Sequence, residues 1–243
     1  MSRLLSERAR VCGQRYSERR QSGKAGWADE DSYARKQGIV RRILTSGHLP
    51  RRCRVLELGC GNGRVTLFTA RKGHDAYGMD IAPEAIDWAR QQARERGIEA
   101  RFTVGSVVTL SAYADGFFDF VFDGDCLFMI LGKDRKACVE NVFRVLKPGG
   151  IFYARAHLVN EKLKTRTRLG GKNYFDPKGQ FSTVEGLPMY YLSRQQEFKD
   201  LIEGAGFRIL CHRIEPKLSA ARKLAFFAGS MWIKAVRSTE GKK

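Results

Sequence analysis

The sequence predicts an α/β protein built on a doubly wound, mostly parallel sheet, and three observations support this fold class. Short apolar segments typical of buried strands alternate with segments of helical periodicity through the middle of the chain. Glycine and proline lie at the boundaries between them. A glycine-rich loop, Gly59-Cys60-Gly61-Asn62-Gly63, joins the first strand to the first helix of this alternation. The predicted sheet is Rossmann-like and seven-stranded, with an antiparallel last strand and additional N-terminal helices.

The middle of the chain accounts for five of these strands. Pro83 near the first turn and Gly97 after the last turn delimit one of its helices. The segment Lys147-Pro148-Gly149-Gly150 ends another. The predicted strands are residues 54–60, 74–81, 100–106, 117–125 and 151–158. The predicted helices are residues 63–72, 83–96 and 133–146.

The two flanks differ from this middle and suggest the domain organisation. Residues 1–53 are expected to form a basic helical extension or lid, with helices over residues 2–22 and 30–45. Residues 54–243 are expected to form one domain with a basic insert at about 159–190, which is long for a loop and low in periodic apolar residues. A helix over residues 193–205, with Ser193 as N-cap, and strands over 207–214 and 230–237 complete it.

Composition restricts the class of protein. The 243 residues contain no apolar run of the length that spans a membrane and no N-terminal secretory signal. The six cysteines form no CxxC pair, so we expect no metal site and interpret them as free thiols of a cytoplasmic protein. The net charge is +18, and residues 55–158 hold 13 basic and 13 acidic residues, so the excess lies in the flanks.

The glycine loop predicts a ligand site at the carboxyl ends of the strands. Glycines permit positive φ and close backbone approach, and the following helix presents its N-terminus. Asp80 ends the second strand, where a carboxylate can accept both hydroxyls of a ribose. Glu57 lies within the first strand and either supports the loop or pairs with an arginine. Arg64 occupies the position of the third glycine of the dinucleotide fingerprint, which disfavours a nicotinamide cofactor.

These motifs resemble those of the class I S-adenosylmethionine-dependent methyltransferases. VLELGCGNGRV resembles motif I of that family, GMDIAPEAIDWAR the second motif, FTVGSVVTL the third and FDFVFDGDCL the fourth. LKPGGIFYA resembles the approach to the fifth strand. The matches follow the order of the family from about residue 54 to 158, so the resemblance implies S-adenosylmethionine as cofactor and S-adenosylhomocysteine as product.

The resemblance implies a role for each matched position. Gly59, Gly61 and Gly63, with Cys60 between them, would let the backbone approach the methionine part and the sugar of the cofactor. Glu57 would hold the loop or the methionine amino group, Asp80 the ribose, and Ile81 the adenine ring. Asp123 and Gly124 would lie beside the methionine moiety and the transferred methyl group.

The third motif departs from the family pattern. The acid that usually follows its glycine and accepts from the adenine amino group is replaced by Ser106. A hydroxyl makes a weaker hydrogen bond to this group than a carboxylate does, although the backbone of Val107 can read the adenine edge. The departure affects the expected affinity for the cofactor and leaves its identity unchanged.

Two residues at strand ends are candidates for catalysis. Asp125 and His157 are expected to face the cofactor, and at least one would act as a base or orient the nucleophile. The alternatives are that Asp125 caps the following helix and that His157 is structural. Cys60 and Cys126 are interpreted as small residues that fill space. Tyr16, Trp27 and Tyr33 in the N-terminal flank are expected either to form part of a lid or to pack in an ordinary core.

The acceptor is the open question at this stage. The favoured hypothesis is a small-molecule methyltransferase, and an anionic acceptor is one reading of its basic flanks. The alternative is an RNA methyltransferase, for rRNA or tRNA, whose basic flanks bind phosphates. The fourth strand ends in DGDCL and lacks the motif of amino-directed nucleic-acid methyltransferases. A non-catalytic cofactor-binding protein is a third possibility, and the sequence indicates neither the methylated atom nor the oligomeric state.

Overall fold

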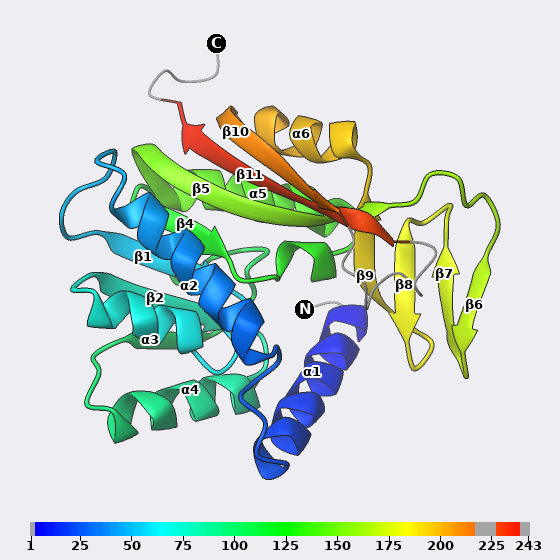
Figure 1. Ribbon diagram of the computed structural model, residues 1–243, viewed down its shortest axis with the longest axis horizontal. Coiled ribbons are helices and arrows are strands. Elements are labelled where there is room, and N and C mark those ends of the chain that lie inside the picture. The colour runs from blue at the N-terminus through cyan, green and yellow to red at the C-terminus, as the bar shows by residue number, and fades with distance from the viewer. Residues whose placement is uncertain (1–2, 217–226, 239–243) are drawn as a thin grey trace.

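A central sheet with helices on both faces organises the chain (Figure 1). The computed structural model describes residues 3–216 and 227–238. Seven strands in these ranges form the predicted sheet in the order β3-β2-β1-β4-β5-β11-β10. Their bounds are β1 Arg54–Leu58, β2 Asp75–Asp80, β3 Arg101–Val104, β4 Phe118–Asp123, β5 Leu146–Val159, β10 Phe207–Pro216 and β11 Phe227–Arg237.

The pairing of the strands confirms the predicted fold class. The strands from β3 to β5 are parallel to their neighbours, whereas β11 is antiparallel to both β5 and β10. β4 is buried along its whole length, as expected for a strand at the centre of a sheet with helices on both faces. The carboxyl ends of β1 to β4 therefore meet at one edge, and this edge carries the glycine loop.

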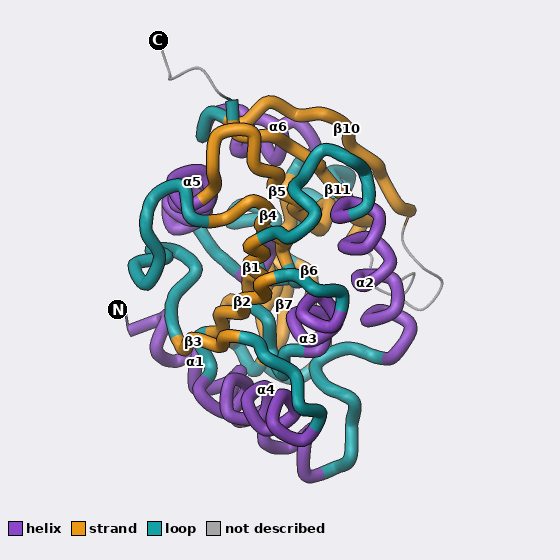
Figure 2. The backbone as a smooth tube through the Cα atoms, turned by 90° about the vertical axis from the view of Figure 1, so that its left-hand side faces the viewer, coloured by secondary structure: helices purple, strands orange, loops and turns teal. Residues whose placement is uncertain are grey.

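The helices cover the two faces of this sheet. Figure 2 shows α2 and α3 on one side of the strands and α5 on the other. α2 and α3 bury Ile39, Val40 and Val65 against Phe120 and Trp232 of the sheet. The α-helices are α1 Arg3–Gln21, α2 Glu30–Leu44, α3 Arg64–Arg71, α4 Pro83–Glu95, α5 Lys133–Val145 and α6 Gln195–Gly204, with a 3-10 turn η1 at Leu127–Met129.

The segment expected to be a long loop, residues 159–190, contains strands, so that part of the prediction is wrong. An antiparallel meander runs through β6 Thr167–Gly170, β7 Asn173–Asp176, β8 Phe181–Val184 and β9 Leu187–Ser193. β9 then pairs parallel with the end of β5, which extends the sheet to the right-hand side of Figure 1. Three of these strands are four residues long, too short for an alternating pattern to be recognised.

The start of α6 also differs from the prediction by one residue. Ser193 ends β9, and its hydroxyl accepts a hydrogen bond from Arg135 Nη2 at 2.9 Å. Arg194 is the N-cap of α6 instead, and its backbone N–H donates to Glu197 of the first turn at 3.3 Å. The Ser193 hydroxyl therefore fixes α5 to the insert.

The helix α1 covers neither face of the sheet and instead connects α4 with β9 across the edge of the sheet. Its residues Val11, Cys12 and Tyr16 pack with Ala85 of α4 and with Met189 of β9. Figure 1 shows α1 between α4 and the strands β8 and β9. The helix therefore spans the edge where the strands end. Among the described residues, no helix is long and apolar enough to cross a membrane.

Candidate active site

The glycine loop at the end of β1 has a backbone that only glycine fits well. Gly59 and Gly61 have φ values of +63° and +52°. A Cβ on Gly59 would lie 2.6 Å from Cβ of Cys126, and one on Gly61 would lie 2.5 Å from the hydroxyl oxygen of Tyr16. Glycine is therefore required at both positions, because the φ values are positive and the side chains of Cys126 and Tyr16 pack directly against the loop.

Asp80 at the end of β2 stabilises this loop. One carboxylate oxygen accepts from the backbone N–H of Gly61 at 2.9 Å, and the other accepts from Ala82 N at 3.0 Å. Burial raises the pKa of Asp80, while these backbone hydrogen bonds act in the opposite direction. The carboxylate thus joins the loops after β1 and β2 at the position predicted from the sequence.

Glu57 in β1 lies beneath the loop. Its Oε2 accepts from the backbone N–H of Thr66 at 2.9 Å and from the Thr66 hydroxyl at 2.6 Å. A Cβ on Gly124 would lie 2.9 Å from Glu57 Oε1, so the glycine at the end of β4 leaves room for this carboxylate. Burial raises the pKa of Glu57 to about 7. In the described residues its partner is thus Thr66, and not the arginine considered from the sequence.

The loop after β3 closes the other end of the site. The Ser106 hydroxyl accepts from the backbone N–H of Val108 at 3.2 Å, so it stabilises its own turn. Ser106 and Val107 line one cleft together with Ile81 of the β2 loop. The hydroxyl that was expected to accept from an adenine amino group therefore also has a role within the protein.

Asp125 pairs with two cations at the end of β4, the buried Lys36 and the half-buried Arg155. Its two oxygens pair with Lys36 Nζ of α2 and with Arg155 Nη1 of β5, both at 2.8 Å. Lys36 also donates to the Gly124 carbonyl at 3.1 Å. Burial acts to raise the pKa of Asp125, but the two cations outweigh it and hold this pKa well below the usual range. The carboxylate is therefore a poor proton acceptor, and it caps no helix.

His157 lies outside the cleft, contrary to the expectation that it faces the cofactor. Its ring stacks on Phe128 with centroids 3.9 Å apart and lies 5.0 Å from the ring of Phe227. His157 is not among the described residues that line the cleft. Burial, with a contribution from Arg155, lowers the pKa of His157 to about 4, so the imidazole is neutral at pH 7.

Most of the predicted cofactor residues line this one cleft, but two do not. Gly63 is turned toward the core, where a Cβ would lie 2.7 Å from the Phe102 ring. The Asp123 carboxylate is occupied by backbone N–H groups of Cys126, Leu127 and Arg155, and burial raises its pKa to about 6. The predicted residues that line the cleft are Glu57, Gly59, Cys60, Gly61, Asp80, Ile81, Ser106, Val107 and Gly124, with Asp125 beside them.

The residues that form a second wall of the cleft were not identified from the sequence. It is formed by α1, by the turn after β4 and by the first turn of α5, and its described members include Leu5, Arg8, Ala9, Met129, Ile130 and Asp134. Leu5, Ala9, Cys12 and Tyr16 recur on one face of α1 at spacings of three and four residues. That periodicity could identify the buried face of the helix, but it does not indicate which segment covers it. Tyr16, Trp27 and Tyr33, which were considered for a lid, also line the cleft.

Comparisons with known proteins agree with this arrangement. A family described as "Methyltransferase domain" matches residues 56–154. A ubiquinone biosynthesis O-methyltransferase of Xanthomonas axonopodis pv. citri is 36% identical over 113 residues, which are 46% of each chain. The chain thus spans about half the length of the curated relatives that it matches.

Solved structures extend the likeness over most of the chain. A SAM-dependent methyltransferase of Methanosarcina mazei has a TM-score of 0.63 and 25% identity, over 80% of this chain and 97% of that one. A 1,6-didemethyltoxoflavin-N1-methyltransferase of Burkholderia thailandensis, solved with its substrate and S-adenosylhomocysteine, has a TM-score of 0.65 and 20% identity, over 96% and 90%. At that identity the second likeness concerns the fold alone.

Residues 56–154 match a methyltransferase domain family, and the chain shares its fold with a solved S-adenosylmethionine-dependent methyltransferase. The glycine loop, Asp80 and the ends of β1 to β4 are the parts of the structure that agree with this class.

Proposed function

We propose that the chain is an S-adenosylmethionine-dependent methyltransferase that acts on a small-molecule acceptor. The observation that carries the proposal is that four loops, after β1, β2, β3 and β4, line a single cleft that α1 closes. Ligands of open α/β sheets bind at this edge. The relative from Xanthomonas is named as an O-methyltransferase, which favours oxygen among the possible acceptor atoms.

The residues present suit this cofactor. Gly59 and Gly61 line the cleft without side chains of their own, so their backbone can approach the methionine part and the sugar, and the buried Asp80 carboxylate would accept the ribose hydroxyls. Glu57 and the Gly124 carbonyl offer acceptors for an ammonium group. When bound, S-adenosylmethionine supplies a methyl group on a positively charged sulfur, a group that requires no further activation.

The surroundings of Asp125 and His157 favour catalysis by alignment over catalysis by a strong base. Asp125 is held ionised by Lys36 and Arg155, and His157 is buried among aromatic rings. Correct alignment of two reactants can by itself contribute about 7 kcal/mol or more. The role of Asp125 is therefore proposed to be indirect, in that it orients Lys36 and Arg155 at the end of β4.

The test is calorimetric binding of S-adenosylmethionine and S-adenosylhomocysteine to the full chain and to Asp80→Ala. We expect micromolar binding that Asp80→Ala abolishes, whereas Asp75→Ala at the opposite end of β2 retains it. Binding of neither cofactor to the wild type would refute the proposal. Binding without turnover on any acceptor would support a non-catalytic role.

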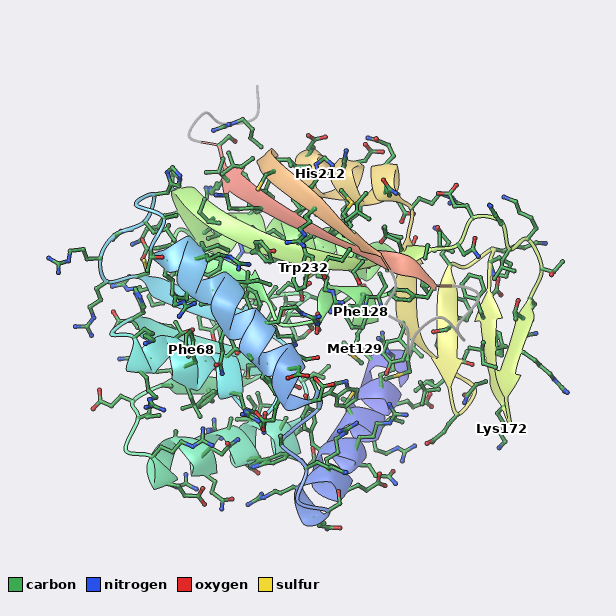
Figure 3. The ribbon with its side chains drawn as sticks, in the orientation of Figure 1. Phe68, Phe128, Met129, Lys172, His212 and Trp232 are labelled. Carbon is green, nitrogen blue, oxygen red and sulfur yellow. The ribbon has the colours of Figure 1, made fainter. Side chains whose placement is uncertain are left out.

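An RNA substrate is the alternative that the same experiment examines. The insert carries basic residues and a contact between the Arg166 guanidinium and the Tyr174 ring at 3.4 Å. Lys172 lies at the outer tip of β6 and β7, far from α1 and the cleft (Figure 3). This position does not favour RNA delivery to the cleft. A steep loss of RNA affinity between two salt concentrations would support the alternative nevertheless.

The compartment is proposed to be the cytoplasm. All six cysteines are free thiols, and five of them are buried or half-buried. Free thiols persist in reducing compartments. A cell-fractionation experiment that recovers the chain outside the cytoplasm would contradict this assignment.

A further inference from the structure

The cleft contains a second buried cation besides Lys36, and its charge has no counterpart in the described residues. Arg8 of α1 lines the cleft and is 8% exposed. Its Nη2 donates to the Met189 carbonyl of β9 at 3.1 Å. Its Nε is buried and has no hydrogen-bond partner in the ranges that the structure describes. A buried donor without a partner is unfavourable, and a ligand acceptor would remove that cost.

The electrostatics of Arg8 differ from those of Lys36. Lys36 is paired with Asp125 at 2.8 Å, whereas no carboxylate of the described residues forms an ion pair with Arg8. Burial lowers the pKa of Arg8, and Asp134 across the cleft acts on it only at longer range. A guanidinium nevertheless stays protonated, so a positive charge remains in the cleft.

Apart from Asp134, the wall of the cleft around Arg8 is apolar. Leu5 and Ala9 of α1 lie on the same wall, and Met129 and Ile130 of the turn after β4 line the cleft with them. Figure 3 shows Met129 beside the end of α1. The guanidinium is therefore the one cation on a wall whose other members, Asp134 apart, are apolar, an arrangement that orients a ligand having one anionic group and an apolar body.

We propose that Arg8 recognises an anionic oxygen of the methyl acceptor, a carboxylate or an ionised hydroxyl carried on an apolar body. This inference rests on the proposed function and names the class of its substrate. A guanidinium forms strong, directional hydrogen bonds with such an oxygen. The Met189 carbonyl fixes the orientation of the guanidinium, and the buried Nε, which has no partner among the described residues, is a donor that remains for a ligand.

The test uses matched acids and amides as probes. Benzoate, 2-naphthoate and octanoate are each titrated against their own amide into the full chain, by calorimetry, with and without saturating S-adenosylhomocysteine. The variants are Arg8→Met, Arg8→Lys, Asp134→Asn and the control Arg10→Met, whose side chain is exposed on the same helix. Retained binding of S-adenosylhomocysteine shows that a variant is folded.

We expect at least one acid to bind about tenfold or more tightly than its amide in the wild type and in Arg10→Met. Arg8→Met should reduce this preference to within about twofold, Arg8→Lys should retain part of it, and Asp134→Asn should strengthen it. Three results would overturn the inference. The first is that the wild type shows no preference for acids, which includes binding no acid at all. The second is that the preference for acids survives in Arg8→Met. The third is that Arg8→Met loses acid and amide affinity equally.

These outcomes are separate from failure of the proposed function. If the wild type binds no S-adenosylhomocysteine, the proposed function fails, whereas the acid preference is still read from the titration without the cofactor. If the cofactor binds and the preference is missing, only the role of Arg8 fails.

Discussion

The two walls of the cleft are built in different ways. The sheet wall consists of loops in which backbone groups and buried carboxylates bond to one another, as Asp80 does with Gly61 and Ala82. The opposite wall consists of side chains of α1 and of the turn after β4. Lys36, the cation beside the sheet wall, pairs with the Asp125 carboxylate and donates to the Gly124 carbonyl. Arg8, the cation of the other wall, has a buried Nε without a hydrogen-bond partner among the described residues. Under the proposed function, the sheet wall is the cofactor side and the wall formed by α1 is the acceptor side.

The largest effect is expected from Lys36→Met, which removes one of the two cations that pair with Asp125. Breaking a buried ion pair typically lowers stability by about 3–5 kcal/mol, and since Arg155 still pairs with the half-buried Asp125, we expect a loss of about 3 kcal/mol, at the lower end of that range. Urea denaturation measures the free energy of unfolding, and Arg41→Met on the exposed face of the same helix is the control. An equal change in the free energy of unfolding of both variants would contradict the view that Lys36 stabilises the fold through Asp125.

Gly59→Ala should have the next largest effect, on the affinity for S-adenosylhomocysteine. The new Cβ would lie 2.6 Å from Cβ of Cys126, so the loop must move, and we expect an affinity loss of about 100-fold. Gly73→Ala is the matched control, because Gly73 has a φ of +85° but its Cβ would meet nothing within 4 Å. Both variants should lose stability, and calorimetry should find the affinity loss only in the first. Similar affinities would show that the sheet wall tolerates adjustment.

Asp80→Asn is expected to have a smaller effect than Gly59→Ala. The amide retains one acceptor oxygen and loses one of the two backbone hydrogen bonds, together with the charge. We expect a loss of cofactor affinity of about 10- to 30-fold, which corresponds to one or two charge-assisted hydrogen bonds. Asp75→Asn, at the other end of β2, should leave the affinity unchanged. Unchanged affinity in Asp80→Asn would remove the ribose role from this residue.

At pH 7 the smallest effect is expected from His157, which lies outside the cleft and changes stability only in acid. The pKa of His157 is lowered to about 4 in the fold, below its value of about 6.5 in an unfolded chain. Between these two pH values the unfolded chain binds more protons, so the free energy of unfolding falls as pH decreases, by about 1.4 kcal/mol per unit. Above pH 6.5 the group contributes no slope.

His157→Leu should reduce this slope, whereas His48→Leu on the surface should retain it. The measurement is urea denaturation at a series of pH values. A slope that is identical in the wild type and in His157→Leu would contradict the burial of a neutral imidazole. Full turnover in His157→Leu would at the same time remove the base role that the sequence suggested for His157.

The sequence was sufficient to predict the strands of the sheet and the loops that form the sheet wall of the cleft. The strands from β1 to β5 were recognisable because their apolar runs and glycine boundaries are local features. Asp80, Gly59 and Gly61 were recognisable because their contacts lie within one βαβ unit. Short strands such as β6 and β7 were missed, because four residues contain too little of an alternating pattern.

Only the tertiary structure decided which charges are paired. Lys36 reaches Gly124 across 88 positions of sequence, and Arg8 reaches Met189 across 181. The same separation explains why Asp125 resembled a free base and why His157 was expected in the cleft. The pKa of a side chain depends on burial and on charges brought near by the fold, and neither is a property of the local sequence.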